Sequence, residues 1–365
     1  MRVRIAVALL ILALLPGCSA LKIAYSQADL IATWMADDYF DLLPEQKDTF
    51  HDYFQRLHAW HRRTQLVQYV SLLESAQERL RAGVKANDAA WAIDSAKTQF
   101  RVIVQHGYAD AARILSGLSD QQLAATRRQF KKTNQKYARE YGAGAPADEQ
   151  RRLRAERNLE RIEHWTGPLT PAQEARIGEL SRALPLIADL RLLERLHRQR
   201  EFLALLAERN NIETFAPRLR DWLIDWDRTR TPPYQAALAR FADASAKLYV
   251  EVFALLTPEQ RKHVSERLQG YIDLLRQLAH EAEKTVRLPS WGFGIVARCL
   301  QCFEARPGIH GTRALIRPEL VHVAKQLHMV AVRILELDAG VTAQPAAPLE
   351  DNRHPALLQV GANIE

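Results

Sequence analysis

The chain has 365 residues, of which 47% are hydrophobic and 25% are charged. This composition is typical of a globular protein that buries a core, and it excludes an intrinsically disordered chain. The formal net charge of +7 is small for this length, and basic residues interleave with acidic ones at helical spacing, which is typical of a solvated helix face and argues against a nucleic-acid-binding protein.

Residues 1–17 have the pattern of an export signal. Arg2 and Arg4 precede an unbroken apolar run of 11 residues, from Ile5 to Leu15. A run of this length is too short to span a bilayer, which takes about 20 residues, but it suits the hydrophobic part of a signal peptide. We therefore expect this segment to be removed from the mature chain.

The segment Leu15-Pro16-Gly17-Cys18 resembles the bacterial lipobox, although Pro16 departs from the commoner small residue. The resemblance implies that Cys18 becomes the first mature residue and carries acyl chains such as palmitate, which anchor the protein to a membrane. Ser19, in place of aspartate, implies sorting to the outer membrane, with the body facing the periplasm. The alternatives are an uncleaved anchor helix and a plain signal peptide with a chance cysteine.

Apolar residues recur at helical spacing along the chain, and no alternating strand pattern occurs before residue 286. Phe50, Tyr53 and Leu57 form one such apolar stripe, and Phe100 and Val104 belong to another. The sequence predicts an all-α fold, an elongated antiparallel helical bundle. The expected helices cover 20–40, 44–82, 88–116, 120–141, 148–165, 171–183, 186–208, 213–228, 234–255 and 258–285.

One five-residue motif occurs four times at expected helix starts. Each copy begins with leucine and ends with glutamine, and a Ser or Thr follows the leucine in three of them. This spacing is that of a capping box, in which the hydroxyl and the glutamine satisfy backbone N–H groups, and proline suits the first helical position. Copy one has Leu43 in place of the hydroxyl residue, so its cap should be incomplete. The motif residues are Pro44 and Gln46, Ser119 and Gln122, Thr170 and Gln173, and Thr257 and Gln260.

The spacing of the copies bears on the domain organisation. Copies one and two lie 76 residues apart, and copies three and four lie 87 residues apart. This favours an internal duplication of a four-helix unit over the simpler interpretation that good helix starts recur in any helical protein. We expect a lipidated N-terminus with a first helix (18–41), a first helical unit (42–141), a linker with a helix (142–168), a second unit (169–285), and an atypical, partly disordered extension (286–365).

Two such motifs per unit, in an all-helical periplasmic protein, resemble the Spy/CpxP family of envelope-stress proteins, and the stretch from Leu248 to Lys262 is the closest match. The resemblance implies helical hairpins that form a curved dimer, and ATP-independent chaperone activity. It rests on the short motifs alone. Members of that family are usually single-unit and unlipidated, whereas this chain is expected to be neither.

A second resemblance covers most of residues 1–285. Its elements, in order, are the lipobox, the stretch from Lys22 to Tyr25, the acidic and aromatic stretch from Asp37 to Leu42, and Trp60-His61-Arg62. This order is similar to that of an uncharacterised family of proteobacterial lipoproteins, which brings no known activity with it.

Three histidines are weak candidates for a metal site. His51, His58 and His61 lie on one expected helix, and the last two are spaced so that they could share an ion. No third ligand is evident, and the alternative is that His51 and His58 are exposed on the polar face while His61 lies beside the apolar stripe at Trp60. Acidic residues also gather between Asp37 and Asp48, where two helices meet. They suit the positive end of the second helix dipole, whereas a catalytic carboxylate pair would need a cleft.

Cys299 and Cys302 form the only other cysteine feature. They could bind zinc together with His322 and His328, form a disulfide in the oxidising periplasm, or stay as free thiols. One further helix is expected at 317–338.

These features favour a non-enzymatic protein-binding module without a cofactor, held at the outer membrane by the lipid on Cys18. The sequence has no glycine-rich phosphate loop, nucleophile elbow or HExxH helix. Three functions stay open: an ATP-independent chaperone for unfolded clients, a structural or assembly lipoprotein with one dedicated envelope partner, and a metal-responsive protein. Neither nucleic acid nor a small-molecule substrate is expected.

Overall fold

The computed structural model describes residues 17–287, and within that range every regular element is an α-helix. The expected all-α fold of antiparallel helices is confirmed. The predicted signal segment and the extension after residue 287, with Cys299 and Cys302, lie outside the described residues. The helices are α2 (Gly17–Ser26), α3 (Ala28–Phe40), α4 (Pro44–Ala82), α5 (Ala86–Ser116), α6 (Asp120–Tyr141), α7 (Ala147–Thr166), α8 (Pro171–Ala183), α9 (Ala188–Ala207), α10 (Ile212–Ile224), α11 (Pro232–Leu255) and α12 (Pro258–Arg287).

The prediction of one helix over 20–40 is wrong, because two helices, α2 and α3, occupy this segment. They meet at Gln27, whose φ of −107° and ψ of 21° lie outside the helical range. Backbone hydrogen bonds continue on both sides of the break, from Gln27 N to Ile23 O and from Ile31 N to Gln27 O. The break therefore redirects the helix without unfolding the segment.

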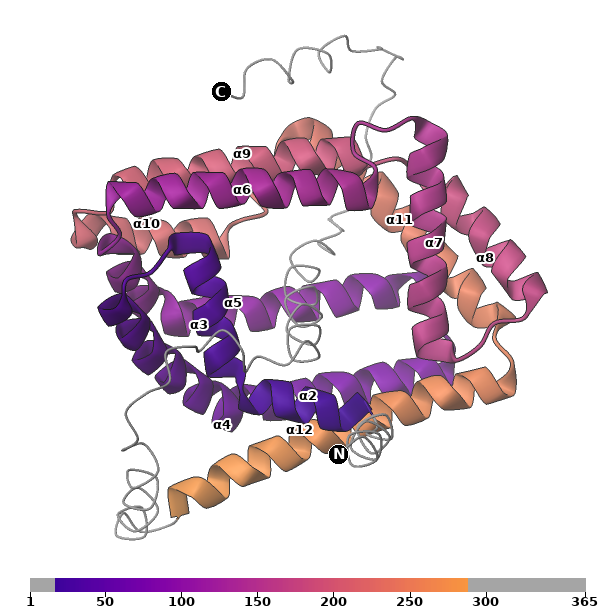
Figure 1. Cartoon of the computed structure of the whole chain (residues 1–365). Coiled ribbons are helices and arrows are strands. Elements are labelled where there is room, and N and C mark those ends of the chain that lie inside the picture. The colour runs from indigo at the N-terminus through magenta and orange to yellow at the C-terminus, as the bar shows by residue number, and fades with distance from the viewer. Residues whose placement is uncertain (1–16, 288–365) are drawn as a thin grey trace, which may run out of the picture.

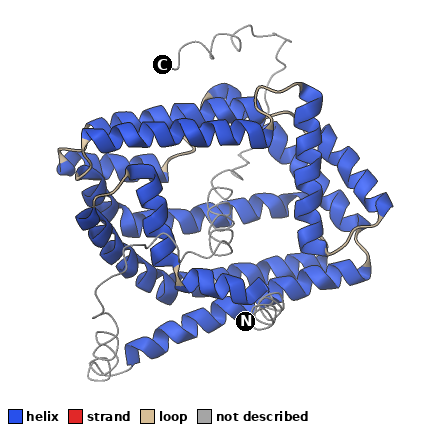
Figure 2. Ribbon diagram, in the orientation of Figure 1, coloured by secondary structure: helices blue, strands red, loops and turns tan. Residues whose placement is uncertain are grey.

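The helices run along the sides of a four-sided frame, as Figure 1 shows. In that view α6 lies beside α9 at the top, α7 beside α8 at the right, and α4 beside α12 at the bottom, and each of these pairs is in contact. Helix α5 packs against α4, α10 and α11. Figure 2 shows that the connections at the corners of the frame are short loops. Short connections favour antiparallel neighbours.

The longest side of the frame pairs two segments that are far apart in the sequence. Gln77 on α4 donates to Ser265 O on α12 at 3.3 Å, and Arg62 donates to Leu278 O at 3.2 Å, so the two helices are antiparallel. Leu66 packs between them against Leu278, and each is 1% exposed. Burying such side chains contributes about 1.5–3 kcal/mol each.

The two expected helical units lie against each other. Helices α4, α5 and α6 of the first range pack against α12, α10 and α9 of the second. The connection between the ranges is also fixed. Gly142 ends α6 in the left-handed conformation with a φ of 72°, and Gly144 N donates to Asp189 of α9 at 2.6 Å. The duplication itself stays a prediction.

Among the helices of residues 17–287, none combines the length and the hydrophobicity needed to cross a bilayer.

Candidate functional site

The four helix-start motifs meet in two pairs. In the first pair, here named the first glutamine clasp, Gln122 Nε2 donates to Gln46 Oε1 at 2.6 Å, and Gln46 Nε2 donates to Gln122 Oε1 at 3.4 Å. Each Nε2 also donates to the backbone carbonyl that precedes the other motif, at Gly117 for Gln46 and at Asp41 for Gln122. The clasp thus fixes the start of α4 against the start of α6.

The second glutamine clasp repeats this arrangement at the starts of α8 and α12. Gln173 Nε2 donates to Gln260 Oε1 at 2.7 Å, and Gln260 Nε2 donates back to Gln173 Oε1 at 3.0 Å. The backbone acceptors are Leu255 O and Pro168 O, both at 2.9 Å. Gln173 and Gln260 are 6% and 9% exposed, so these bonds replace hydration that the amides have lost.

The same glutamines also complete the helix caps. The hydroxyls of Ser119, Thr170 and Thr257 accept from the backbone N–H three residues on, at 3.2–3.3 Å. Each glutamine oxygen accepts in return from the backbone N–H of its own capping residue. At copy one only this second bond exists, because Leu43 has no side-chain acceptor. Every polar atom of the four amides is therefore bonded.

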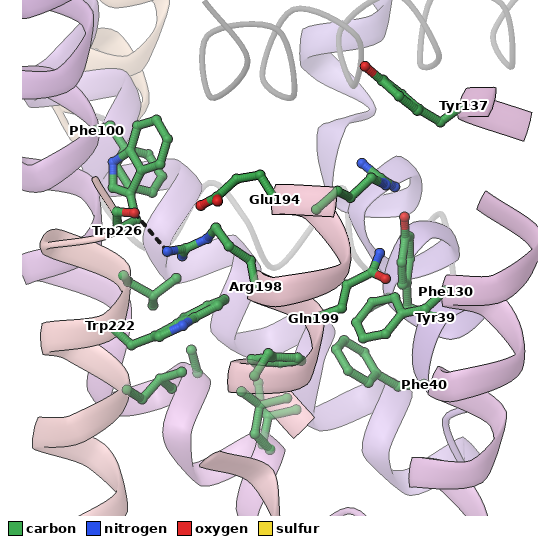
Figure 3. A pocket seen from close by; sticks show the side chains of 18 of the residues that line it. Tyr39, Phe40, Phe100, Phe130, Tyr137, Glu194, Arg198, Gln199, Trp222 and Trp226 are labelled. Carbon is green, nitrogen blue, oxygen red and sulfur yellow. Dashed lines mark hydrogen bonds between the residues drawn. The ribbon is translucent and has the colours of Figure 1, made fainter. Parts of the chain in front are cut away.

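A cavity of about 600 Å³ lies next to the first clasp and is lined from α3, α4, α5, α6, α9, α10 and α11. Pockets of roughly 300–1,000 Å³ are typical of ligand sites. Leu42 connects the cavity to the clasp, because it lines the cavity and lies between Asp41, whose carbonyl accepts from Gln122, and Leu43, whose N–H donates to Gln46. Figure 3 shows side chains of the lining around α9.

Aromatic rings form a continuous part of the cavity wall. Tyr39 meets Phe130 edge to face with ring centroids 6.1 Å apart, and Phe130 lies 6.3 Å from Phe202. Phe202 in turn stacks on Trp222 at 5.2 Å. These separations are within the favourable range for aromatic pairs. The wall therefore combines α3, α6, α9 and α10 into one apolar surface (Figure 3).

Arginines from one face of α9 occupy the polar part of the lining. Arg191, Arg195 and Arg198 follow the spacing that brings side chains to the same side of a helix. The Arg198 guanidinium lies 4.4 Å from the Trp222 ring centroid and donates to Trp226 O at 2.7 Å, a bond drawn in Figure 3. Burial lowers the pKa of Arg198. Even so, a guanidinium stays protonated at neutral pH.

One carboxylate shares this lining. Glu194 is 5% exposed, and its Oε2 accepts from the backbone N–H of Thr231 at 3.1 Å and from the Thr231 hydroxyl at 2.8 Å. These bonds cap the start of α11, where a negative charge suits the helix dipole. Glu194 Oε1 has no hydrogen-bond partner among the described residues. A buried carboxylate oxygen normally has one.

The three candidate histidines do not converge. His61 is bonded at both ring nitrogens, to the Tyr25 hydroxyl at 2.8 Å and to the Tyr69 hydroxyl at 3.1 Å, and burial lowers its pKa to about 4. His58 packs against the Tyr25 ring, and His51 bonds Gln55. Within the described part of the chain, no group of three or more His, Cys, Asp or Glu residues is placed to hold a metal ion.

The acidic cluster between Asp37 and Asp48 is spread over the corner between α3 and α4. Asp37 accepts from Leu42 N at 3.1 Å and pairs with Lys47 at 3.0 Å. Asp38 bonds Gln129 of α6. These carboxylates hold a corner of the frame, and none of them lines the cavity.

The sequence identifies part of the cavity only. Tyr53 and Phe100, on two of the expected apolar stripes, line it. The arginines of α9 are not among the expected site residues, since Glu194 and Glu201 interleave with them as on a solvated face. The position of these arginines on the helix is the one feature of the sequence that could have identified them as site residues. Arg191, Arg195 and Arg198 share a helix face with Phe202, and an aromatic residue on a charged face indicates that the face is covered.

Comparison with known proteins identifies a family without an assigned role. The model of a family of unknown function, DUF6279, matches residues 38–235, just over half of the chain. The chain belongs to this family. The expectation of an uncharacterised family is thus confirmed. The match runs from the end of α3 to the start of α11, and this range includes every residue of the cavity lining except Ala36. No curated protein matches the chain, and no solved structure does.

Proposed function

We propose that this DUF6279 protein is a non-enzymatic binding protein of the cell envelope, which holds apolar segments of other proteins in the cavity beside the first clasp. The observation that carries the proposal is the aromatic wall formed by Tyr39, Phe130, Phe202 and Trp222. Aromatic surfaces supply large contact areas with little loss of side-chain entropy, so they suit the binding of varied apolar side chains.

The proposed location of the protein in the cell follows from the lipobox alone. The lipid on Cys18 would hold the body at the outer membrane, facing the periplasm, where unfolded proteins and assembly intermediates expose apolar segments. The motif resemblance to the Spy/CpxP family supports an ATP-independent chaperone as the finer form of this function.

A binding role agrees with the chemistry of the lining better than catalysis does. General acid–base catalysis by carboxylates commonly uses a pair, whereas Glu194 is the single carboxylate of the lining. One of its oxygens is committed to the start of α11. Arg198 is fixed on the Trp222 ring and the Trp226 carbonyl, and Arg195 on side chains of α6, which suits recognition of a ligand.

The test uses residues 18–365 with Cys18→Ser, so that the chain carries no lipid. Light scattering of an aggregating client protein is followed at rising ratios of this chain, without nucleotide. We expect suppression near equimolar ratio. Ala111→Trp, which fills the cavity from α5, should abolish it, whereas Ala59→Trp, on an exposed position of α4, should not. No suppression by the folded parent chain would rule out the chaperone form.

A single dedicated envelope partner is the second candidate, and the arginines of the cavity favour it, because fixed polar groups add specificity to an apolar site. Here the discriminating measurement is cross-linking of the lipidated chain in cells. One stoichiometric product that Ala111→Trp removes would support a dedicated partner, whereas many weak products would support general clients.

A further inference from the structure

The cavity beside the first clasp is apolar along its wall and carries arginines from one face of α9. Arg195 and Arg198 line it close to Glu194, the one acidic residue among the described lining, while Arg191 and Arg230 lie in the same lining with interactions of their own. Glu201 lies outside the lining, 3.9 Å from Arg198, and offsets part of its charge. In a partly enclosed site, a guanidinium charge acts more strongly on an entering group than it would in bulk water.

The two central arginines are held in place. Arg195 donates to Asn134 at 2.8 Å and to Thr133 at 3.3 Å, both on α6. Arg198 is fixed between the Trp222 ring and the Trp226 carbonyl. A guanidinium has five N–H groups, so each retains donors beyond these bonds. Donors that are fixed before binding lose little entropy when a ligand arrives.

Glu194 provides an independent sign of a ligand. Its side chain is 95% buried, given an exposed fraction of 5%, and its Oε1 is the one carboxylate oxygen of the lining without a partner among the described residues. This oxygen needs a hydrogen-bond donor. A polypeptide supplies backbone N–H donors, whereas an acyl chain with an anionic head supplies none.

We propose that the bound segment is acidic as well as apolar: its apolar side chains pack on the aromatic wall, a carboxylate reaches Arg195 and Arg198, and a backbone N–H donates to Glu194 Oε1. This inference rests on the proposed function and specifies the partner chemistry of the same cavity. Arginine and carboxylate form paired, charge-assisted hydrogen bonds, which are about twice as strong as neutral ones. A lysine in the segment would meet the arginines with like charge.

The experiment measures the affinity of short fluorescent peptides for residues 18–365 with Cys18→Ser. The peptides share phenylalanine and glycine positions and differ at one residue, which is Glu, Gln or Lys. We expect the Glu peptide to bind about tenfold more tightly than the Gln peptide, and the Lys peptide to bind most weakly. Raising the salt concentration should reduce the difference between them.

Variants of the protein then locate the effect. Arg195→Gln should remove most of the preference for Glu over Gln, and Arg195→Lys should retain it, because lysine keeps the charge although it cannot reproduce both bonds to α6. Arg151→Gln, at a half-exposed position of α7 outside the cavity lining, is the matched control and should change nothing. Circular dichroism shows whether each variant is folded, and the peptide series on the parent chain needs no variant at all.

Each outcome decides one point. Equal affinity for the Glu and Gln peptides, or tighter binding of the Lys peptide, overturns the acidic-segment proposal and leaves the binding function intact. No binding of any peptide contradicts the proposed function itself. Palmitate that binds with Arg195-dependent affinity, while no peptide does, overturns the proposal in favour of a small anionic amphiphile.

Discussion

Gln173 and Gln260 lie 87 residues apart in the sequence, and each donates its amide hydrogens to the other's oxygen and to the backbone carbonyl that precedes the other's motif. Each amide oxygen also accepts from its own capping residue. Two helix starts are thereby joined by a closed set of bonds in which no donor is left over.

Because this set of bonds is closed, substitutions of the two glutamines should have non-additive effects on the free energy of unfolding. Gln173→Leu should lower the free energy of unfolding by about 1–3 kcal/mol, because Gln260 then keeps buried polar atoms without partners. Gln260→Leu should cost about the same, and the double variant should cost less than the sum of the two. Urea unfolding checks this, with the exposed Gln135→Leu on α6 as control. Additive losses would contradict the coupling.

The backbone conformation of Asp41 predicts that glycine at this position is tolerated better than valine. It ends α3 in the left-handed region, with φ of 50° and ψ of 58°, and its carbonyl accepts from Gln122 of the first clasp. Asp41→Gly should be neutral or slightly stabilising, whereas Asp41→Val should cost about 1–2 kcal/mol. Thermal unfolding of the two variants gives the comparison, and a valine variant as stable as the parent would be the contrary result.

Two helical glycines should respond to alanine with opposite signs. At Gly107 of α5, an added Cβ would lie 2.9 Å from the Tyr53 hydroxyl, which also donates to Gly107 O. Gly107→Ala should therefore displace Tyr53 and lower the free energy of unfolding by about 1 kcal/mol. At Gly178 of α8 the nearest atom is the flexible end of Arg182, at 3.4 Å. There, Gly178→Ala should stabilise by up to about 1 kcal/mol. Denaturant titration measures both.

His61 predicts a loss of stability in acid. Its pKa in the folded chain is about 4, against an ordinary value of 6.5. Between these values the unfolded chain binds a proton that the folded chain does not, so the stabilisation is complete above pH 6.5 and falls as the pH drops towards 4. We expect a loss of about 3 kcal/mol over this window. His61→Gln should flatten the profile, and the exposed His263→Gln should leave it unchanged.

The helix positions could be predicted from the sequence, because apolar periodicity and helix capping depend on residues that are close in the sequence. The spacing of 76 and 87 residues also groups the motifs as the clasps do, Gln46 with Gln122 and Gln173 with Gln260. The reciprocal hydrogen bonds between the glutamines could not be predicted from this spacing. A capping glutamine gives the same sequence pattern whether its N–H₂ group donates to water or to a second glutamine. The break at Gln27 was also hidden, because glutamine is a good helix former.

The cavity was harder to predict from the sequence, because the burial of a charged helix face depends on which other helices pack over it. Arg195 is covered through Asn134 of α6, and Arg198 through Trp222 of α10. Neither partner is near in sequence, so no local pattern distinguishes these arginines from solvated ones.

The pairing of α4 with α12 has a consequence for the order in which the protein can fold. A chain synthesised from its N-terminus presents Leu66 and Val70 long before Leu278 and Ile272 arrive to cover them. The frame therefore closes last at its longest side, and a chain cut before Pro258 keeps that apolar stripe exposed. Until α12 has been made, this protein presents to its surroundings the kind of surface that we propose it binds in others.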